Sequence, residues 1–127
     1  MKEIRIIIAG GRDFDDYILL CERLDTYIGY IDIGPKDYVE IISGCVQGAD
    51  KLGERYALDN CHFIKRYPAD WERYGKSAGP IRNREMAEYA AEKNGVLFAF
   101  WDGKSKGTKN MIETAEKFGL ETHVVIY

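Results

Sequence analysis

The chain has few cysteines and histidines, and this scarcity excludes several classes of protein. Its three cysteines are Cys21, Cys45 and Cys61; no two of them have CxxC spacing, and only two histidines accompany them. A disulfide-stabilised domain has an even set of cysteines, and a structural zinc site needs four closely spaced ligands. The sequence therefore predicts neither disulfides nor a metal site, and the three thiols are expected to be reduced and buried.

A long apolar run is also lacking. The apolar stretch near the N-terminus, Ile6–Ala9, is too short for the core of a signal peptide and runs into Arg12 and Asp13. A membrane-spanning helix needs about 20 consecutive apolar residues, and no later segment approaches this length. We therefore expect no signal peptide, no contact with a membrane and a cytoplasmic location.

The chain carries no net positive charge. Its formal charge is −3, from 18 lysines and arginines against 21 aspartates and glutamates. Non-specific binding to nucleic acid draws most of its free energy from neutralisation of phosphates by lysine and arginine. A nucleic-acid role would need a local basic patch, so this class of partner is disfavoured.

Short apolar runs alternate along the chain with stretches in which apolar residues recur at helical spacing. The runs predict strands at 4–9, 39–42, 62–67, 96–101 and 122–127, and the spacing predicts helices near 17–28, 49–57, 81–93 and 108–119. Strands that are apolar on both faces and separated by helices form parallel sheets covered on both sides, because each parallel connection needs a crossover. The sequence predicts one doubly wound α/β domain over residues 1–127, with a parallel sheet of about five strands.

Particular residues mark where these elements begin and end. Asp15 or Asp16 is placed to cap the first helix, Thr108 to cap the fourth, and Gly119 to end it. Between the third strand and the third helix, Tyr67–Pro80 contains two of the three prolines and has no helical period. This composition predicts a long loop, and long loops in compact domains often carry function.

Glycine-rich turns follow three of the predicted strands, and the carboxyl ends of parallel strands meet at one edge of a sheet. Glycine lets the backbone approach a ligand, and the helix that follows presents unpaired N–H groups that suit a phosphate. The alternative is that the glycines only permit tight turns and close packing, but three such turns at one edge favour a ligand site. None matches the Walker loop or a GxGxxG motif. The predicted ligand-binding residues are Gly10, Gly11, Arg12 and Asp13; Ser43, Gly44, Gly48, Ala49 and Asp50; and Asp102, Gly103, Gly107 and Thr108.

Two charged side chains in these turns have both a binding and a structural interpretation. For Arg12 the favoured interpretation is a bidentate contact between its guanidinium and a phosphate, and the alternative is a structural ion pair with Asp13. Asp50 is placed equally well to cap the second helix or to accept hydrogen bonds from ribose hydroxyls. A cluster that either attracts phosphate or is simply solvated comprises Lys104, Lys106 and Lys109.

The predicted loop and the start of the third helix add further candidates. Trp71 and Tyr74 have flat side chains that either stack on a base or pack the loop onto the domain, and burial against the domain is favoured for Trp71. Arg82, Asn83 and Arg84 open the third helix after the flexible turn Ala78-Gly79-Pro80. This polar cluster favours a contact with a phosphate or a base.

The motifs together resemble one protein family. The segments that carry the resemblance are GGRDF (10–14), SGCVQGAD (43–50), PADWERYGKSAGPIRNREM (68–86) and AFWDGKSKGT (99–108). In this order they are similar to the YpsA-related branch of the SLOG superfamily, which joins Rossmann-like nucleotide sensors to the DNA-processing protein A group and the Lonely Guy phosphoribohydrolases. The resemblance implies a sheet of order 3-2-1-4-5 and binding of a nucleotide or a nucleotide derivative.

The chain departs from the phosphoribohydrolases at the position of their catalytic acid. Those enzymes carry PGGxGTxxE; here Trp101-Asp102-Gly103 replaces Pro-Gly-Gly, Gly107-Thr108 matches, and Met111 stands at the glutamate position. Glu113 lies about 200° around a helix from Met111 and is a poor substitute. The arginine of those enzymes would correspond to Arg84 or Arg82, and the carboxylates left as catalytic candidates are Asp13, Asp50, Glu54, Glu85 and Asp102.

Three classes of function follow from the sequence. The leading class is a domain that binds a nucleotide or nucleotide derivative, with sensing as one use of it. The second is a nucleotide-processing hydrolase, a phosphoribohydrolase-like N-glycosidase with an atypical carboxylate. The third, a module that binds single-stranded nucleic acid, is disfavoured by the acidic charge. No cofactor is expected, and a homo-oligomer is left open.

Overall fold

The computed structural model describes residues 2–127, whose five parallel strands form one sheet of order β3-β2-β1-β4-β5. The strands are β1 (Glu3–Gly10), β2 (Tyr38–Ser43), β3 (Phe63–Arg66), β4 (Gly95–Trp101) and β5 (Glu121–Ile126). The helices are α1 (Tyr17–Tyr30), α2 (Ala49–Asp59), α3 (Trp71–Tyr74), α4 (Ala78–Ala91) and α5 (Lys106–Lys117), with a 3-10 turn at Gly75–Ser77. The predicted fold class and strand order are confirmed.

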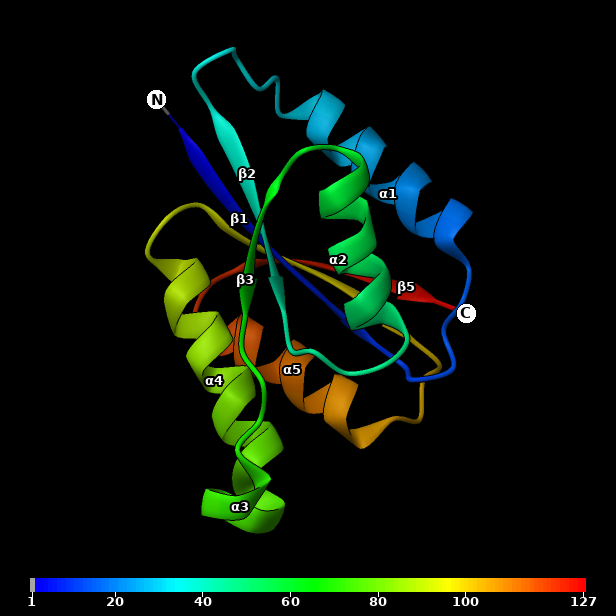
Figure 1. Cartoon of the computed structure of the whole chain (residues 1–127), viewed down its shortest axis with the longest axis vertical. Coiled ribbons are helices and arrows are strands. Elements are labelled where there is room, and N and C mark those ends of the chain that lie inside the picture. The colour runs from blue at the N-terminus through cyan, green and yellow to red at the C-terminus, as the bar shows by residue number, and fades with distance from the viewer. Residues whose placement is uncertain (1) are drawn as a thin grey trace.

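The two faces of the sheet are covered by different helices (Figure 1). Ile6 and Ile8 of β1 pack in one buried cluster with residues of α1 and α2. Ile7 and Ala9 belong to a second cluster with residues of α4 and α5. Successive side chains of a strand point to opposite faces, so an uninterrupted apolar run such as β1 fits a strand buried on both sides.

The helix ends agree with the sequence at two places and differ at a third. Asp16 accepts a hydrogen bond from the Leu19 amide and caps α1, as predicted, and Gly119 follows α5 with a φ of +75°. The prediction that Thr108 caps α5 is wrong, because the cap is Ser105, whose Oγ lies 3.4 Å from the Thr108 amide nitrogen. Asp102 accepts hydrogen bonds from the Lys104 and Ser105 amides, and this tight turn allows the helix to begin earlier.

The segment predicted as a long loop, Tyr67–Pro80, is partly helical. Asp70 accepts a hydrogen bond from the Arg73 amide and caps the single turn of α3. Helix α4 begins at Ala78, before the predicted start, and includes Pro80 in its first turn. A proline is tolerated there because the first N–H groups of a helix have no partner within it.

The expectation of three buried thiols is also wrong. All three cysteines are free, but Cys21 and Cys45 are partly exposed and Cys61 is exposed. Cys45 and Cys61 adopt left-handed backbone conformations, with φ of +67° and +56°, which places them in turns outside the core. Within residues 2–127, no helix combines the length and the apolar character that crossing a bilayer requires.

Candidate ligand-binding cleft

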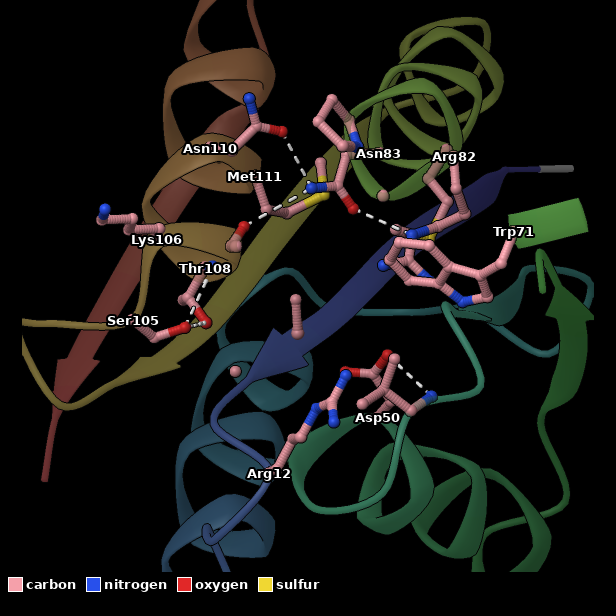
Figure 2. Close-up of a pocket in the computed structure, with 17 residues that line it drawn as sticks. Arg12, Asp50, Trp71, Arg82, Asn83, Ser105, Lys106, Thr108, Asn110 and Met111 are labelled. Atoms are coloured by element: carbon pink, nitrogen blue, oxygen red, sulfur yellow. Dashed lines mark hydrogen bonds between the residues drawn. The ribbon is translucent and has the colours of Figure 1, made fainter. Parts of the chain in front are cut away.

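A cleft of about 400 Å³ lies beyond the carboxyl end of β1, at the side where α4 and α5 begin (Figure 2). In a doubly wound sheet the strand order reverses here, between β1 and β4, because the crossovers from these strands run to opposite faces. The residues that line the cleft are Ala9, Gly10, Arg12, Val46, Asp50, Trp71, Gly79, Pro80, Arg82, Asn83, Met86, Ser105–Thr108, Asn110 and Met111.

The first turn of α5 has unpaired backbone donors in residues that line the cleft. The Thr108 amide is bound to the Ser105 hydroxyl and the Lys109 amide to the Ser105 carbonyl. Among residues 2–127 no acceptor binds the amides of Lys106 and Gly107, and both residues line the cleft. Unpaired amides at a helix N-terminus carry partial positive charge and favour an anion.

Arg12 adds a cationic side chain on the opposite side of the cleft. Its guanidinium points toward Asp50 and the interior of the cleft in Figure 2, whereas the side chain of Lys106 points outward. Arg12 is exposed, and in the described part of the chain no carboxylate lies within 4.0 Å of it. The predicted alternative, a pair with Asp13, is not formed, because Asp13 accepts a hydrogen bond from the Tyr127 hydroxyl.

Asp50 brings a buried carboxyl group to the cleft. Its exposed fraction is 5%, and Oδ2 accepts one hydrogen bond, of 3.2 Å, from the Val46 amide. Burial raises the pKa of Asp50 to about 6, although the Val46 hydrogen bond and the charge of Arg82 act in the opposite direction. Asp50 does not cap α2, since Gly48 holds the cap position and no side chain caps the helix.

Arg82 and Asn83 connect the walls of the cleft. Arg82 donates from Nη1 to the Gly44 carbonyl at 2.6 Å and from Nε to Oδ1 of Asn83 at 2.9 Å. Asn83 donates from Nδ2 to Oδ1 of Asn110 at 2.9 Å and to the Gly107 carbonyl at 3.4 Å. The loop after β2, helix α4 and helix α5 are thereby joined.

Trp71 lies on the rim of the cleft. It is 53% exposed, so the prediction that it is buried against the domain is wrong. One edge of its ring approaches Gly79, where an added Cβ would lie 3.7 Å from the indole. The ring packs on the first turn of α4 and leaves much of its surface open. Tyr74, on the same helical turn, does not line the cleft.

The comparison with known families agrees with this architecture. The sequence model for the YspA, cpYpsA-related SLOG family matches residues 4–74, more than half of the chain. The chain belongs to this SLOG family. It is also 30% identical over 121 residues to the Gene 61 protein of Mycobacterium phage D29, with 91% of each chain covered. No solved structure matches the chain.

Membership of the SLOG family indicates nucleotide-related binding or processing in general. The matched segment contains Arg12, Asp50 and Trp71 of the cleft. Helices α4 and α5, which supply the opposite walls, lie beyond it.

The structure brings part of the predicted site together in this SLOG protein and places the rest elsewhere. The predicted residues that line the cleft are Gly10, Arg12, Asp50, Trp71, Arg82, Asn83, Gly107 and Thr108. Those that do not line it are Gly11, Asp13, Ser43, Gly44, Gly48, Ala49, Asp102 and Gly103. Ligand contact by the first group remains a prediction.

Gly11 and Gly48, in the first two glycine-rich turns, pack against each other and do not line the cleft. The Gly11 carbonyl accepts hydrogen bonds from the Phe14 and Ala49 amides. A Cβ added at Gly48 would lie 2.2 Å from the Gly11 carbonyl oxygen, and Gly48 has a φ of +95°. At these positions the glycines permit close packing, which was the alternative interpretation.

Only one of the candidate catalytic carboxylates lines the cleft, and it is Asp50. Glu54 lies one helical turn later and is held by the Ser43 hydroxyl at 2.6 Å and by Nε of Arg66 at 3.0 Å. Glu85 is exposed on α4, and Arg84 pairs with Glu88 on the outer face of the same helix. Asp102 binds the amides of its own turn.

The predicted ligand-binding set omitted several residues that line the cleft, and they are Ala9, Val46, Gly79, Pro80, Met86, Ser105 and Asn110. Two more lining residues were considered in the sequence, Lys106 as either attracting phosphate or solvated and Met111 as standing at the position of the phosphoribohydrolase acid. Helical spacing could have indicated Met86, because it follows Asn83 by three residues. No comparable signal in the sequence identifies Val46.

Proposed function

We propose that this SLOG protein binds a nucleotide or a nucleotide derivative in the cleft. The phosphate would lie between the first turn of α5 and the guanidinium of Arg12. The observation that carries the proposal is the pair of unpaired amides, Lys106 and Gly107, at the same cleft as this unpaired arginine. Backbone N–H groups at a helix N-terminus together with a guanidinium form a common phosphate site.

The remaining walls suit a base. Met86 and Met111 are buried in the core below the cleft, and Trp71 offers an open aromatic face at the rim. Base stacking on an aromatic side chain is favourable for every nucleobase. A volume of about 400 Å³ also lies within the range of small-molecule sites.

Calorimetric titration with AMP, GMP and ADP-ribose tests the proposal. Arg12→Gln should weaken binding by about ten- to a hundredfold, since a hydrogen bond to a charged group contributes about 1.5–3 kcal/mol. Arg55→Gln is the matched control, because it removes the same charge from an exposed position on α2 outside the cleft. Binding of none of the three nucleotides, or equal losses in both variants, would contradict the proposal.

Gly44→Val tests the location of the site. A Cβ at Gly44 would lie 2.7 Å from Nη1 of Arg82 and 2.8 Å from Oδ2 of Asp50, so valine would displace both side chains. We expect nucleotide binding to be lost while the far-ultraviolet circular dichroism is kept. Unchanged affinity in the folded variant would place the ligand elsewhere.

A second candidate function is hydrolysis of the N-glycosidic bond with Asp50 as the acid or base. The observation that favours it is a pKa of about 6 in the only carboxyl group lining the cleft, since proton transfer is most efficient when the pKa lies near the working pH. Release of free base from AMP, eliminated in Asp50→Asn, would establish it. Turnover that appears only in Met111→Glu would instead identify the wild-type chain as a binder.

A further inference from the structure

One side chain of the cleft has no N–H donor left for a phosphate, and only one lone pair of its amide oxygen is unoccupied. Asn83 is 5% exposed, its Nδ2 donates to Oδ1 of Asn110 and to the Gly107 carbonyl, and its Oδ1 accepts from Nε of Arg82. An asparagine amide has two N–H donors, and both are directed at protein acceptors. A phosphate, which only accepts hydrogen bonds, therefore finds no free donor on Asn83, and the predicted contact with a phosphate needs another interpretation.

The partners of Asn83 belong to the two walls that would hold the ligand. Gly107 is in the first turn of α5, where two residues with unpaired amides line the cleft. Arg82 reaches 38 residues back along the chain to the Gly44 carbonyl, next to the loop where the Val46 amide holds Asp50. Asn83 thus lies at the centre of a chain of hydrogen bonds from Gly44 to Asn110, which is drawn in part as dashed lines in Figure 2.

The backbone carbonyls of Gly44 and Gly107 accept hydrogen bonds from Arg82 and Asn83, and the local structure at each glycine makes this contact effective. Gly44 has no side chain where the Arg82 guanidinium lies, because a Cβ would come within 2.7 Å of Nη1. The Gly107 carbonyl shares a peptide group with the Thr108 amide in the first turn of α5, so a hydrogen bond to this carbonyl orients the helix turn that carries the free amides. Fixing both ends sets the separation of the two walls.

We propose that Asn83 is a positioning residue, which orients Arg82 and the first turn of α5 for a phosphate without touching the ligand. This inference rests on the proposed function for its purpose, but the positioning itself is a property of the unliganded protein. It has two consequences, one for the free protein and one for binding, and these are measured separately.

The first experiment is amide hydrogen exchange of the unliganded protein. In Asn83→Ala the amides of Asn110, Met111 and Val46 should exchange about tenfold faster, because local opening of α5 and of the loop after β2 becomes easier. Core amides of β1 and β4 should be unchanged. Arg84→Ala is the matched control, since it alters the next residue of α4, which is exposed and pairs only with Glu88.

Asn83→Asp separates the two ends of the chain of hydrogen bonds. Aspartate keeps an acceptor for Arg82 and loses both donors to α5. Exchange should therefore quicken at Asn110 and Met111 and stay unchanged at Val46. Unchanged exchange at all three amides in Asn83→Ala, or equal acceleration throughout the sheet, would overturn the proposal whether or not any nucleotide binds.

The second experiment compares AMP with adenosine by calorimetric titration. Asn83→Ala should weaken AMP binding by about tenfold and adenosine binding by less than about twofold, because only AMP uses the helix terminus that Asn83 orients. Equal losses for both compounds would identify Asn83 as a direct contact of the base or ribose and overturn the positioning role. If wild type binds neither compound, the binding proposal fails, and the exchange experiment still decides the positioning role.

Discussion

At the scale of single residues, Asp50 is a buried carboxyl group whose ionised form is destabilised by its surroundings. A buried carboxylate with one hydrogen bond to its ionised form is under-solvated, which is why burial is the largest cause of its raised pKa. The groups that act on its pKa besides burial are the Val46 amide, Arg82 of α4 and Glu54 of α2, and the Arg12 guanidinium also points toward it (Figure 2). The guanidinium of Arg82 and the carboxylate of Asp50 do not approach within 4.0 Å of each other in the described chain, so the charge is not neutralised by a direct pair.

This environment predicts the pH dependence of stability. The folded pKa of about 6 lies above the ordinary value of 3.8, so the folded state binds the proton more tightly than the unfolded state and loses stability as the pH rises from about 4 to about 6. One pKa unit corresponds to about 1.4 kcal/mol, and the total loss is of the order of 2–3 kcal/mol. Asp50→Asn should therefore be more stable than wild type above about pH 6, with the advantage shrinking toward pH 4.

Urea unfolding followed by circular dichroism over this pH range measures the difference. Glu113→Gln is a suitable control, because that carboxylate is exposed on α5 and away from the cleft. A pH-independent difference between Asp50→Asn and wild type would show that Asp50 is ionised in the folded protein with an ordinary pKa.

Trp71 is the residue whose role is easiest to follow by spectroscopy, since the chain has two tryptophans. If a base stacks on its open face, AMP should quench the fluorescence of Trp101→Phe, which retains Trp71, and should not quench that of Trp71→Phe. Trp71→Ala should weaken binding by about ten- to a hundredfold, because stacking contributes about 1–3 kcal/mol per base. Quenching that persists in Trp71→Phe would remove Trp71 from the site.

At the scale of elements, the distance between α2 and β1 depends on one glycine. Gly53 lies in the middle of α2, where a Cβ would be 2.7 Å from Cβ of Ile8 and 2.9 Å from both of its γ carbons. Ile8 is fully buried and cannot move aside. A glycine lowers helix stability by about 1 kcal/mol relative to alanine, and here that cost is offset by close packing of the helix on the sheet.

Gly53→Ala should consequently destabilise the protein despite its better helix propensity. Overpacking of a core typically costs about 1–3 kcal/mol, and chemical unfolding should show a loss of this size. Gly29→Ala is the matched comparison, because Gly29 lies in α1 with no atom within 4 Å of an added Cβ. That variant should be more stable by about 0.5–1 kcal/mol. A stabilised Gly53→Ala would contradict the close packing of α2 on β1.

At the scale of the whole molecule, the distribution of charge favours a small anion over a nucleic acid as the ligand. The net charge is −3, and the cationic groups of the cleft are few and set among apolar side chains. A single phosphate fits such a site, whereas a polynucleotide needs a series of cations along its backbone.

We therefore predict no measurable binding of single-stranded oligothymidine at about 150 mM salt, with any dissociation constant weaker than about 10⁻⁴ M. Fluorescence anisotropy of a labelled oligonucleotide is the measurement. Lowering the salt should produce at most a weak signal. Micromolar binding that weakens steeply with added salt would move this SLOG protein into the class of nucleic-acid binders.

Local patterns in the sequence were enough to predict the doubly wound α/β class and the position of most elements, and both are confirmed. These features depend on local patterns, because an apolar run, helical spacing or a glycine at a strand end each involves only a few neighbouring residues. The strand order came from the resemblance to the SLOG family rather than from any pattern. The local signal is misleading in Tyr67–Pro80, because Pro80 is typical of a loop but is tolerated in the first turn of α4.

Which residues of the predicted edge line the cleft depends on the folded chain as a whole. Asp50 and Glu54 are one turn apart on α2, yet one lines the cleft and the other is held by Ser43 and Arg66. Gly11 and Gly107 both belong to glycine-rich turns, but a hydrogen bond from the Ala49 amide occupies the carbonyl of Gly11. These outcomes depend on contacts between residues far apart in the chain, which the pattern of a single segment does not encode.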